Sequence, residues 1–350
     1  MKDRDLAWWL VENAGPVIRY RTLREILEVQ DIELIADSLE RLFDSILVKM
    51  WMERLVPRMG FHAFHSSDPF AFENAIGKIV QLGLHAGLQQ FDNKTIKFRT
   101  WLAESIATSD YEDVGPWNGF SELLLASFLA YAGYAETTPV KSVTLERLNI
   151  TSKFARDFDP ENIYVKGSKK EYLVQPQFYI DIPWGLLLVH DIRGFASSKW
   201  ILEDKSYRER VEKVVSVILT KEYQSLKPGY GYLKHGTTYY SIGWSAHVPN
   251  FISSPTTNDM SKLILSLEMM ASFDTARKSQ WFSDSLDLLE ETRTEEGHYR
   301  FPSKWLPEKP SGYWDGGHYM ALEVDRRKRA TLDYESTFRV LYIRKLAGLF

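Results

Sequence analysis

The segment with the most chemically reactive side chains lies close to the carboxyl end of the chain, between residues 313 and 318. Two adjacent glycines stand there between an acid and an imidazole, and glycine lets a ligand approach the backbone closely. Asp315 and His318 could therefore share a proton as general acid and base. The two rings that precede them, Tyr313 and Trp314, are expected to bind the ligand.

Charged side chains follow this segment. Glu335 could take part in the same chemistry. The simpler expectation is that Glu335 pairs with Arg326 or Arg327 and holds the last hairpin against the rest of the protein.

A second group of candidates is aromatic and consists of Tyr239, Tyr240, Trp244 and His247. Such rings can stack on sugars, or can hold a carbocation against their negative faces. The same rings could equally form a small core beneath a long loop. The residue types alone leave both interpretations open.

A third group contains Asp181, flanked by the rings of Tyr179 and Trp184, together with Trp117 from an earlier segment. Burial at the start of an apolar helix would raise the pKa of Asp181 and suit it to act as a general acid. Asp181 also lies two residues before Pro183, a position typical of a residue that caps a helix. Capping is the commoner role of such an aspartate.

Metal or cofactor binding is weakly indicated. His62 and His65 could bind a metal with Asp68 or Glu73, but no further ligand stands at a diagnostic spacing, and the chain has no cysteine. No phosphate-binding loop, dinucleotide fingerprint or nucleophile elbow is present either. We therefore predict neither a metal nor a cofactor.

The candidates precede or begin apolar segments with helical periodicity. Each segment spans about three turns, and the two clearest ones end at a glycine suited to terminate a helix. A more polar amphipathic stretch follows each of the first four. The apolar segments are residues 72–84, 120–134, 183–192, 258–273 and 333–348, and the polar stretches lie near 94–107, 140–154, 205–222 and 276–291.

Alternation of apolar and polar helices predicts an all-α fold with an inner and an outer ring of helices, an α/α toroid; an open solenoid is the alternative. Residues 58–350 would supply the helical hairpins, and the helices of residues 1–57 would cap or complete the ring within one compact domain. Every inner helix of such a ring starts at the same rim. The long aromatic loops before these helices should therefore meet at one mouth.

Composition excludes several functions. The net charge of -4 gives no basic surface for nucleic acid, and no window is apolar enough to cross a membrane. The amino end lacks the apolar core of a signal peptide, so we expect a cytoplasmic protein. Neither the oligomeric state nor a protein partner can be predicted.

The layout resembles that of the α/α toroid proteins, which include terpenoid cyclases and the β subunits of protein prenyltransferases. Trp8-Trp-Leu10 followed by residues 16–23, and Gly312-Tyr-Trp-Asp-Gly-Gly-His318 followed by residues 334–341, look like uncharacterised bacterial members of that group. These segments cover less than a fifth of the chain. The resemblance implies a ring of helical hairpins around a central cavity.

The functional motifs of those families are missing. The chain has no Asp-x-Asp-Asp acid, no Asp-Asp-x-x-Asp magnesium motif and no cysteine for a prenyltransferase zinc site. We therefore expect a central cavity that binds or transforms an elongated apolar molecule, such as an isoprenoid, with residues other than those motifs. The alternatives are a carbohydrate-active toroid using Asp181 with Asp315 or Glu323, and a non-catalytic repeat protein that binds a peptide.

Overall fold

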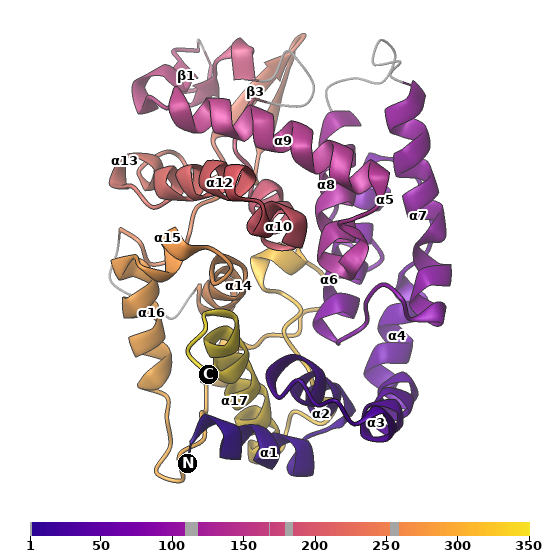
Figure 1. Ribbon diagram of the computed structural model, residues 1–350. Helices are drawn as coiled ribbons and strands as arrows, with labels where there is room; N and C mark the ends of the chain where they lie inside the picture. Colours follow the sequence, from indigo (N-terminus) through magenta and orange to yellow (C-terminus); the bar gives the residue numbers. More distant parts are fainter. Residues whose placement is uncertain (1, 109–117, 168, 179–184, 253–258) are drawn as a thin grey trace.

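A computed structural model describes residues 2–108, 118–167, 169–178, 185–252 and 259–350 of the chain. The fold is mostly α-helical with one small sheet (Figure 1). Both termini lie at the same end of the molecule, where α1 (Asp3–Asn13) packs against α17 (Arg329–Leu346). The chain thus returns to its starting point.

The apolar segments form helices that contact one another in sequence order. These are α6 (Phe72–Gln81), α8 (Asn118–Leu129), α10 (Val189–Ala196), α14 (Met260–Met270) and α17, and each packs against the next. The order closes through α2 (Pro16–Arg21), which contacts α17, because Arg21 Nη1 donates to the carbonyl of Gln81 at 2.8 Å. The predicted apolar helices are confirmed, although the third begins at Val189, later than expected.

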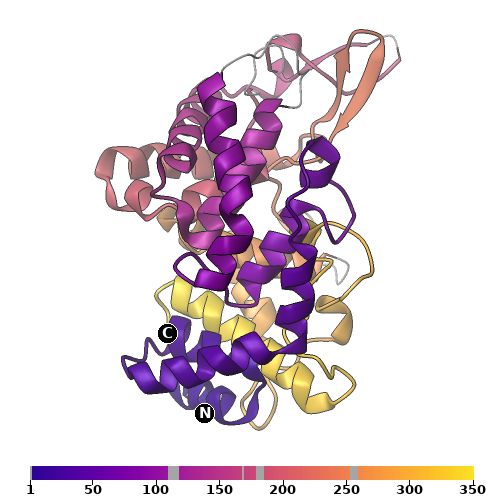
Figure 2. The same cartoon turned by 90° about the vertical axis from the view of Figure 1, so that its right-hand side faces the viewer.

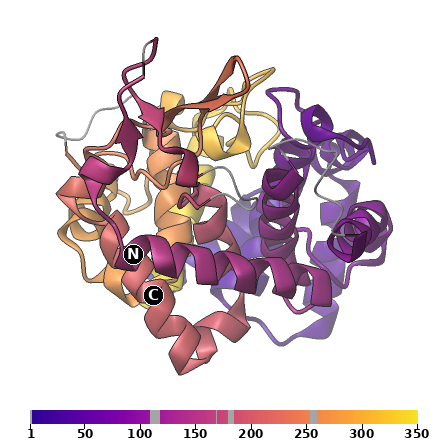
Figure 3. The ribbon, with the colours of Figure 1, turned by 90° about the horizontal axis from the view of Figure 1, so that it is seen from above.

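The polar stretches form the helices α7 (Gln89–Thr108), α9 (Thr138–Arg156), α12 (Lys205–Ile218) and α16 (Gln280–Glu290), as predicted. Helix α8 packs against both α7 and α9, α9 packs against α10 and α12, and α14 packs against α16. Seen from above, α12 lies towards the side opposite the β hairpin (Figure 3). Short helices connect these elements: α11 (Lys199–Glu203), α13 (Lys221–Gln224) and α15 (Asp274–Arg277).

The amino-terminal region consists of short helices at the lower end of the molecule (Figure 2). Ser45 has an extended backbone and separates α3 (Ile32–Asp44) from α4 (Ile46–Arg54). The carboxylate of Asp31 caps α3 by accepting from Leu34 N at 3.0 Å. The remaining elements before α6 are a π-helical turn, η1 (Thr22–Ile26), and the short helix α5 (Phe61–Phe64).

Glycines end α6 and α8, the first two of the five apolar helices, which we call the inner helices. Gly83 has φ +99° and Gly133 has φ +97°, backbone conformations that residues with a Cβ atom rarely adopt. Gly83 follows Leu82, the residue that caps the end of α6, and Gly133 belongs to η4 (Ala130–Tyr134), a π-helical turn that continues α8. The predicted helix ends at these two glycines are confirmed.

The all-α prediction misses a four-stranded sheet at the upper end of the molecule (Figures 1 and 2). Strand β2 pairs antiparallel with β1 and parallel with β3, and β3 pairs antiparallel with β4. The β3–β4 hairpin turns at Gly236, whose φ is +59°. Its strands are rich in aromatic and β-branched residues, which favour strands. The bounds are β1 (Tyr164–Val165), β2 (Leu173–Val174), β3 (Gly231–His235) and β4 (Thr238–Ile242).

Candidate functional site

Three long loops meet over the amino-terminal ends of the inner helices. The first and the last are joined by a backbone hydrogen bond from Gly312 N to Ser67 O at 2.8 Å. The loop after β4 is joined to the start of α10, because Val189 N donates to Trp244 O at 2.8 Å. This agrees with the predicted convergence of the loops. Residues 109–117 and 179–184, which make up most of the other two loops, lie outside the described residues.

Asn74 in the first turn of α6 holds the first and last loops together. Its side-chain nitrogen donates to the carbonyls of Ser66 and Asp68, each at 2.8 Å, and its side-chain oxygen accepts from Trp314 N at 2.8 Å. Trp314 begins the short 3-10 helix η8 (Trp314–Gly316), which packs against α6. The hydrogen bonds of Asn74 therefore place the neighbouring Glu73 and Asp315 close together.

The start of α10 is held by a buried ion pair. Arg147 of α9 contacts both carboxylate oxygens of Asp191, with distances of 2.7 and 2.8 Å, and also donates to the carbonyl of Leu186 at 2.8 Å. Asp191 in turn accepts from Leu188 N at 2.8 Å and so caps its own helix. These contacts set the position of His190, the residue before Asp191.

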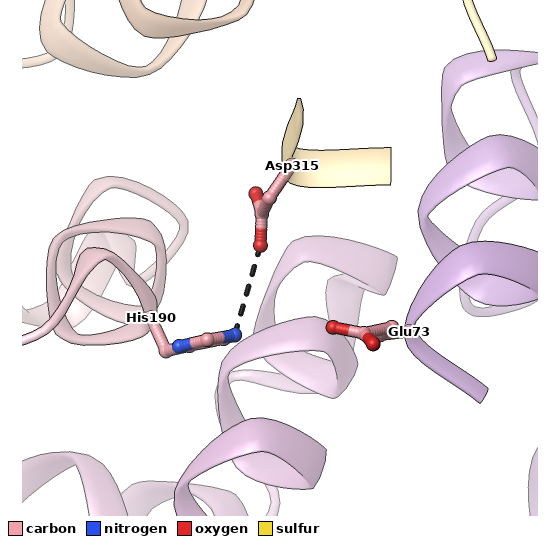
Figure 4. Close-up of side chains that lie close together, drawn as sticks. All are labelled: Glu73, His190 and Asp315. Atoms are coloured by element: carbon pink, nitrogen blue, oxygen red, sulfur yellow. Dashed lines mark ion pairs between the residues drawn. The ribbon is translucent and has the colours of Figure 1, made fainter. Parts of the chain in front are cut away.

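Glu73, His190 and Asp315 form the centre of the site (Figure 4). One ligand atom from each lies within 4.8 Å of the others, and His190 Nε2 is 3.6 Å from Asp315 Oδ2. All three side chains are buried, with exposed fractions of 1%, 0% and 5% respectively. We call these three residues the central trio.

Two further charged or polar side chains orient the carboxylates of the trio. Arg193 Nη2 donates to Asp315 Oδ1, and His65 Nδ1 lies 2.8 Å from Glu73 Oε1. His65 Nε2 accepts from Trp244 Nε1 at 3.0 Å, so the ring proton of a neutral His65 is on Nδ1, next to Glu73.

Aromatic rings close the site on the loop side. Phe120 of α8 packs edge-on against His65 and His190, with ring centroids 5.3 Å apart in both cases. Trp244 contacts the same two histidines, and Tyr313 stacks on His65 at 5.2 Å. The rings exclude water and lower the local dielectric constant, which strengthens every electrostatic interaction inside.

Several buried polar atoms at and around the central trio make no hydrogen bond. Among the described residues, no partner within hydrogen-bonding geometry exists for either ring nitrogen of His190, for Asp315 Oδ2, for Trp314 Nε1, or for Nε and Nη1 of Arg193. An unsatisfied buried polar group costs about 1–3 kcal/mol. Such a concentration of unmet groups is typical of a site that receives a ligand.

Burial shapes the protonation states. It lowers the pKa of His190 well below its ordinary value, and the nearby Arg193 guanidinium adds to this effect, so the ring is neutral at physiological pH. Burial raises the pKa of Glu73, an effect that the contact with His65 opposes. Burial also lowers the pKa of Arg193 to about 10, which leaves it charged. The trio can thus offer a nitrogen lone pair beside two carboxyl groups.

A cavity of about 380 Å³ lies at the opposite ends of the inner helices from the loops. Trp314 and Arg193 line it and also belong to the site, so they form the boundary between the two. The Arg193 guanidinium lies 4.7 Å from the centre of the Trp314 ring. The mouth expected among the loops is therefore filled by rings, and the open space is on the other side.

Four of the residues proposed from the sequence are brought together here: Trp244, Tyr313, Trp314 and Asp315. Asp315 pairs with Arg193 and lies 3.6 Å from Nε2 of His190, instead of sharing a proton with His318. His318 Nδ1 accepts from Tyr313 N at 3.0 Å and so shapes the loop.

Two other candidates, Tyr240 and His247, contact the strand or loops next to their own. Tyr240 lies in β4, opposite Leu233 of β3. His247 contacts the hydroxyl of Ser245 at 2.6 Å and the carbonyl of Leu226 at 3.2 Å, which ties its loop down. The remaining proposed residues, Trp117, Tyr179, Asp181 and Trp184, lie outside the described residues.

The predicted pairing of Glu335 is confirmed. Its carboxylate contacts Arg326 at 2.9 Å and accepts from the backbone nitrogens of Leu322 and Glu323 at 2.6 and 2.9 Å. Glu335 therefore fastens the last loop to α17.

Sequence reasoning missed His190 and Arg193, and gave Glu73 only a marginal role as a metal ligand. All three lie within apolar helices, where periodicity identifies the helix but gives no reason to single out one member. The available signal was the presence of ionisable residues in otherwise apolar inner helices, with His190 and Arg193 three positions apart and so on one face.

Comparison with known proteins finds no matching family model, no matching curated protein and no matching solved structure. In the described part of the chain, no helix has the length and apolar character needed to cross a membrane.

Proposed function

We propose that this chain binds an elongated, largely apolar small molecule, such as an isoprenoid, in the cavity at the centre of an α/α toroid. The observation that carries the proposal is the cavity of about 380 Å³ enclosed by the carboxyl ends of the inner helices. Its volume lies within the range of about 300–1,000 Å³ that is usual for ligand sites.

The lining supports an apolar occupant. Aliphatic and aromatic side chains come from every inner helix or the turn that follows it: Val80, Leu84, Tyr131, Ala196, Leu265, Met269, Tyr342 and Leu346. Four cationic side chains, Arg21, Arg24, Arg193 and Lys199, and two acidic ones, Glu25 and Glu268, lie at the same cavity, and Glu25 pairs with Arg21 and Arg24. The surplus of cationic groups would favour a molecule with an anionic end, such as a carboxylate or phosphate ester.

The order in which the inner helices pack against one another supports the toroid. Each packs on the next, and the bond from Arg21 to Gln81 joins the amino-terminal helices to α6. In a toroid, the trio would lie at the inner end of the cavity, beyond Trp314 and Arg193. A reacting group that reached this point would meet a neutral imidazole and two carboxyl groups, a set suited to proton transfer.

A carbohydrate-active protein is the second proposal, because Glu73 and Asp315 hold carboxylate oxygens within 4.8 Å of each other. Retaining glycosidases place their carboxyl groups about 5 Å apart. Both carboxylates here are buried behind rings, however, and a sugar chain would require Phe120, Trp244 and Tyr313 to move. The enclosed geometry therefore favours the apolar ligand.

Ligand binding can be tested with a variant that fills the cavity. Ser272 lines the cavity, whereas Ser283 is exposed on α16. We expect native mass spectrometry to show one bound farnesol or farnesyl phosphate on the wild-type chain and on Ser283→Trp, with binding at least tenfold weaker in Ser272→Trp. Equal binding by all three proteins would refute the proposal, and selective binding of oligosaccharides would favour the second one.

A further inference from the structure

We propose that Glu73, His190 and Asp315 bind one divalent transition-metal ion, such as Zn²⁺. This inference goes beyond the proposed ligand in the cavity, because metal binding at the trio requires no organic molecule. The three residues come from α6, α10 and η8, and their side chains point towards a common centre (Figure 4).

The separations suit a small cation. Zn²⁺ binds imidazole nitrogen and carboxylate oxygen at about 2.0–2.2 Å, which places neighbouring ligands of a tetrahedral site about 3.4 Å apart. His190 Nε2 and Asp315 Oδ2 are already 3.6 Å apart, and all three ligand atoms lie within 4.8 Å of one another. Small rotations of the Glu73 and Asp315 side chains would bring the three ligand atoms to the separations of a tetrahedral site.

His190 supplies the observation that points to a ligand. Its side chain is fully buried, and among the described residues neither ring nitrogen has a hydrogen-bond partner. Phe120, Phe128 and Trp244 surround the ring and offer it no acceptor through their carbon faces. Asp315 Oδ2, the atom that faces His190, is likewise buried without a hydrogen bond. A metal ion between them would satisfy both atoms at once.

The surroundings are those of a metal site. Metal-binding carboxylates usually contact a second polar group that orients them, and here Glu73 contacts His65 while Asp315 contacts Arg193. When they bind a metal, the two carboxyl groups act as carboxylates, and together they carry more negative charge than one guanidinium neutralises, which favours a cation. One imidazole and two carboxylates form a nitrogen and oxygen set that suits Zn²⁺ or Mn²⁺ better than Ca²⁺, which takes six to eight oxygens.

A purely structural cluster is the competing explanation. The pairs of Arg193 with Asp315 and of His65 with Glu73 could exist only to stabilise the packing of the loops. That explanation accounts for the contact of Asp315 Oδ1 with Arg193 and for the contact of Glu73 with His65, but it leaves Asp315 Oδ2 and both nitrogens of His190 buried and unsatisfied. The two explanations differ in whether the folded chain takes up a metal ion.

Metal uptake is the direct test. The full chain is stripped with a chelator, dialysed against Zn²⁺ or Mn²⁺, and analysed for metal content by mass spectrometry. We expect one ion per wild-type chain, and at least tenfold weaker binding in each of Glu73→Gln, His190→Gln and Asp315→Asn. The controls His298→Gln and Glu323→Gln change a buried histidine and a partly buried glutamate outside the trio, and should bind like the wild type.

A measurement on the wild-type chain covers the case in which the trio variants do not fold. X-ray absorption of the Zn²⁺-loaded protein should show a first shell of nitrogen and oxygen that contains one imidazole. A shell with two or more imidazoles, or a wild-type chain that takes up no metal, would overturn the proposal. Ser272→Trp should bind metal normally, so that failure at the trio and failure of the cavity proposal can be told apart.

Discussion

Trp314 N donates to the side-chain oxygen of Asn74 at 2.8 Å, and this bond sets the distance between Glu73 and Asp315, the neighbours of the two bonded residues in the sequence. Glu73 precedes Asn74 and Asp315 follows Trp314, so the two carboxylates of the site are brought together by one amide side chain. Asn74 also donates to the carbonyls of Ser66 and Asp68. One residue thus satisfies backbone groups from two loops that lie far apart in sequence.

Removal of this amide should be costly. Asn74→Ala would lose one buried and two partly buried hydrogen bonds, and an unpaired buried partner costs about 1–3 kcal/mol. We expect the free energy of unfolding to fall by about 3 kcal/mol or more in chemical denaturation. Asn93→Ala, at an exposed position on α7, is the control and should change it by less than about 0.5 kcal/mol. A loss in Asn74→Ala no larger than in this control would contradict the role assigned to Asn74.

Gly77 lets α6 approach η8 closely. A Cβ atom at this position would come within 2.7 Å of the Trp314 ring, which is itself buried. Gly77→Ala should therefore displace Trp314 and destabilise the chain by about 1–3 kcal/mol, the usual cost of overpacking. Gly243→Ala, where a Cβ would meet nothing within 4 Å, should be nearly neutral. Thermal unfolding and tryptophan fluorescence would measure both, and equal effects in the two variants would refute the argument.

Most of the helices could be predicted because their signal is local. The apolar stretch of α6 and the glycine at 83 that follows it lie within one short window, and the same holds for α8 and Gly133. The meeting of three loops agrees with the expected topology, because a ring of helical hairpins would start all of its inner helices at one end. These features need no knowledge of which side chains finally touch.

The centre of the site could not be predicted because it depends on pairs distant in sequence. His190 meets Asp315 only after α10 and η8 are both in place, and the position of α10 depends on Arg147 of another helix. The sheet was missed for a similar reason: β2 is two residues long and is held by its parallel pairing with Tyr232 of β3. Local pattern does not reveal such partners.

Glu323 should make the stability depend on pH. Burial raises its pKa to about 7, and the hydrogen bond from Gly15 N opposes the rise. The unfolded carboxyl ionises near its ordinary pKa of about 4.3. Between these values the unfolded chain binds fewer protons than the folded chain, so the free energy of unfolding falls as the pH rises from about 4.3 to 7.

Glu323→Gln should remove this dependence and leave the variant about 2–3 kcal/mol more stable than the wild type at pH 8, relative to their difference at pH 4. The amide oxygen can still accept from Gly15 N. Denaturant unfolding at several pH values is the measurement, with Glu53→Gln at an exposed position of α4 as the control. Parallel pH profiles of wild type and Glu323→Gln would show that the carboxyl group is ionised in the folded protein.

The ion pair between Arg147 and Asp191 should be essential for the position of His190. Both side chains are buried, so Arg147→Met would leave the carboxylate of Asp191 without its cation, at a cost of about 3–5 kcal/mol. The same helix offers a matched control, because Arg156 pairs with Asp157 at an exposed position and Arg156→Met should have no measurable effect. If Arg147→Met remains folded, we expect a shift of the His190 ring resonances in its NMR spectrum, since the start of α10 loses its anchor. Unchanged stability together with unchanged His190 resonances would show that packing alone places α10.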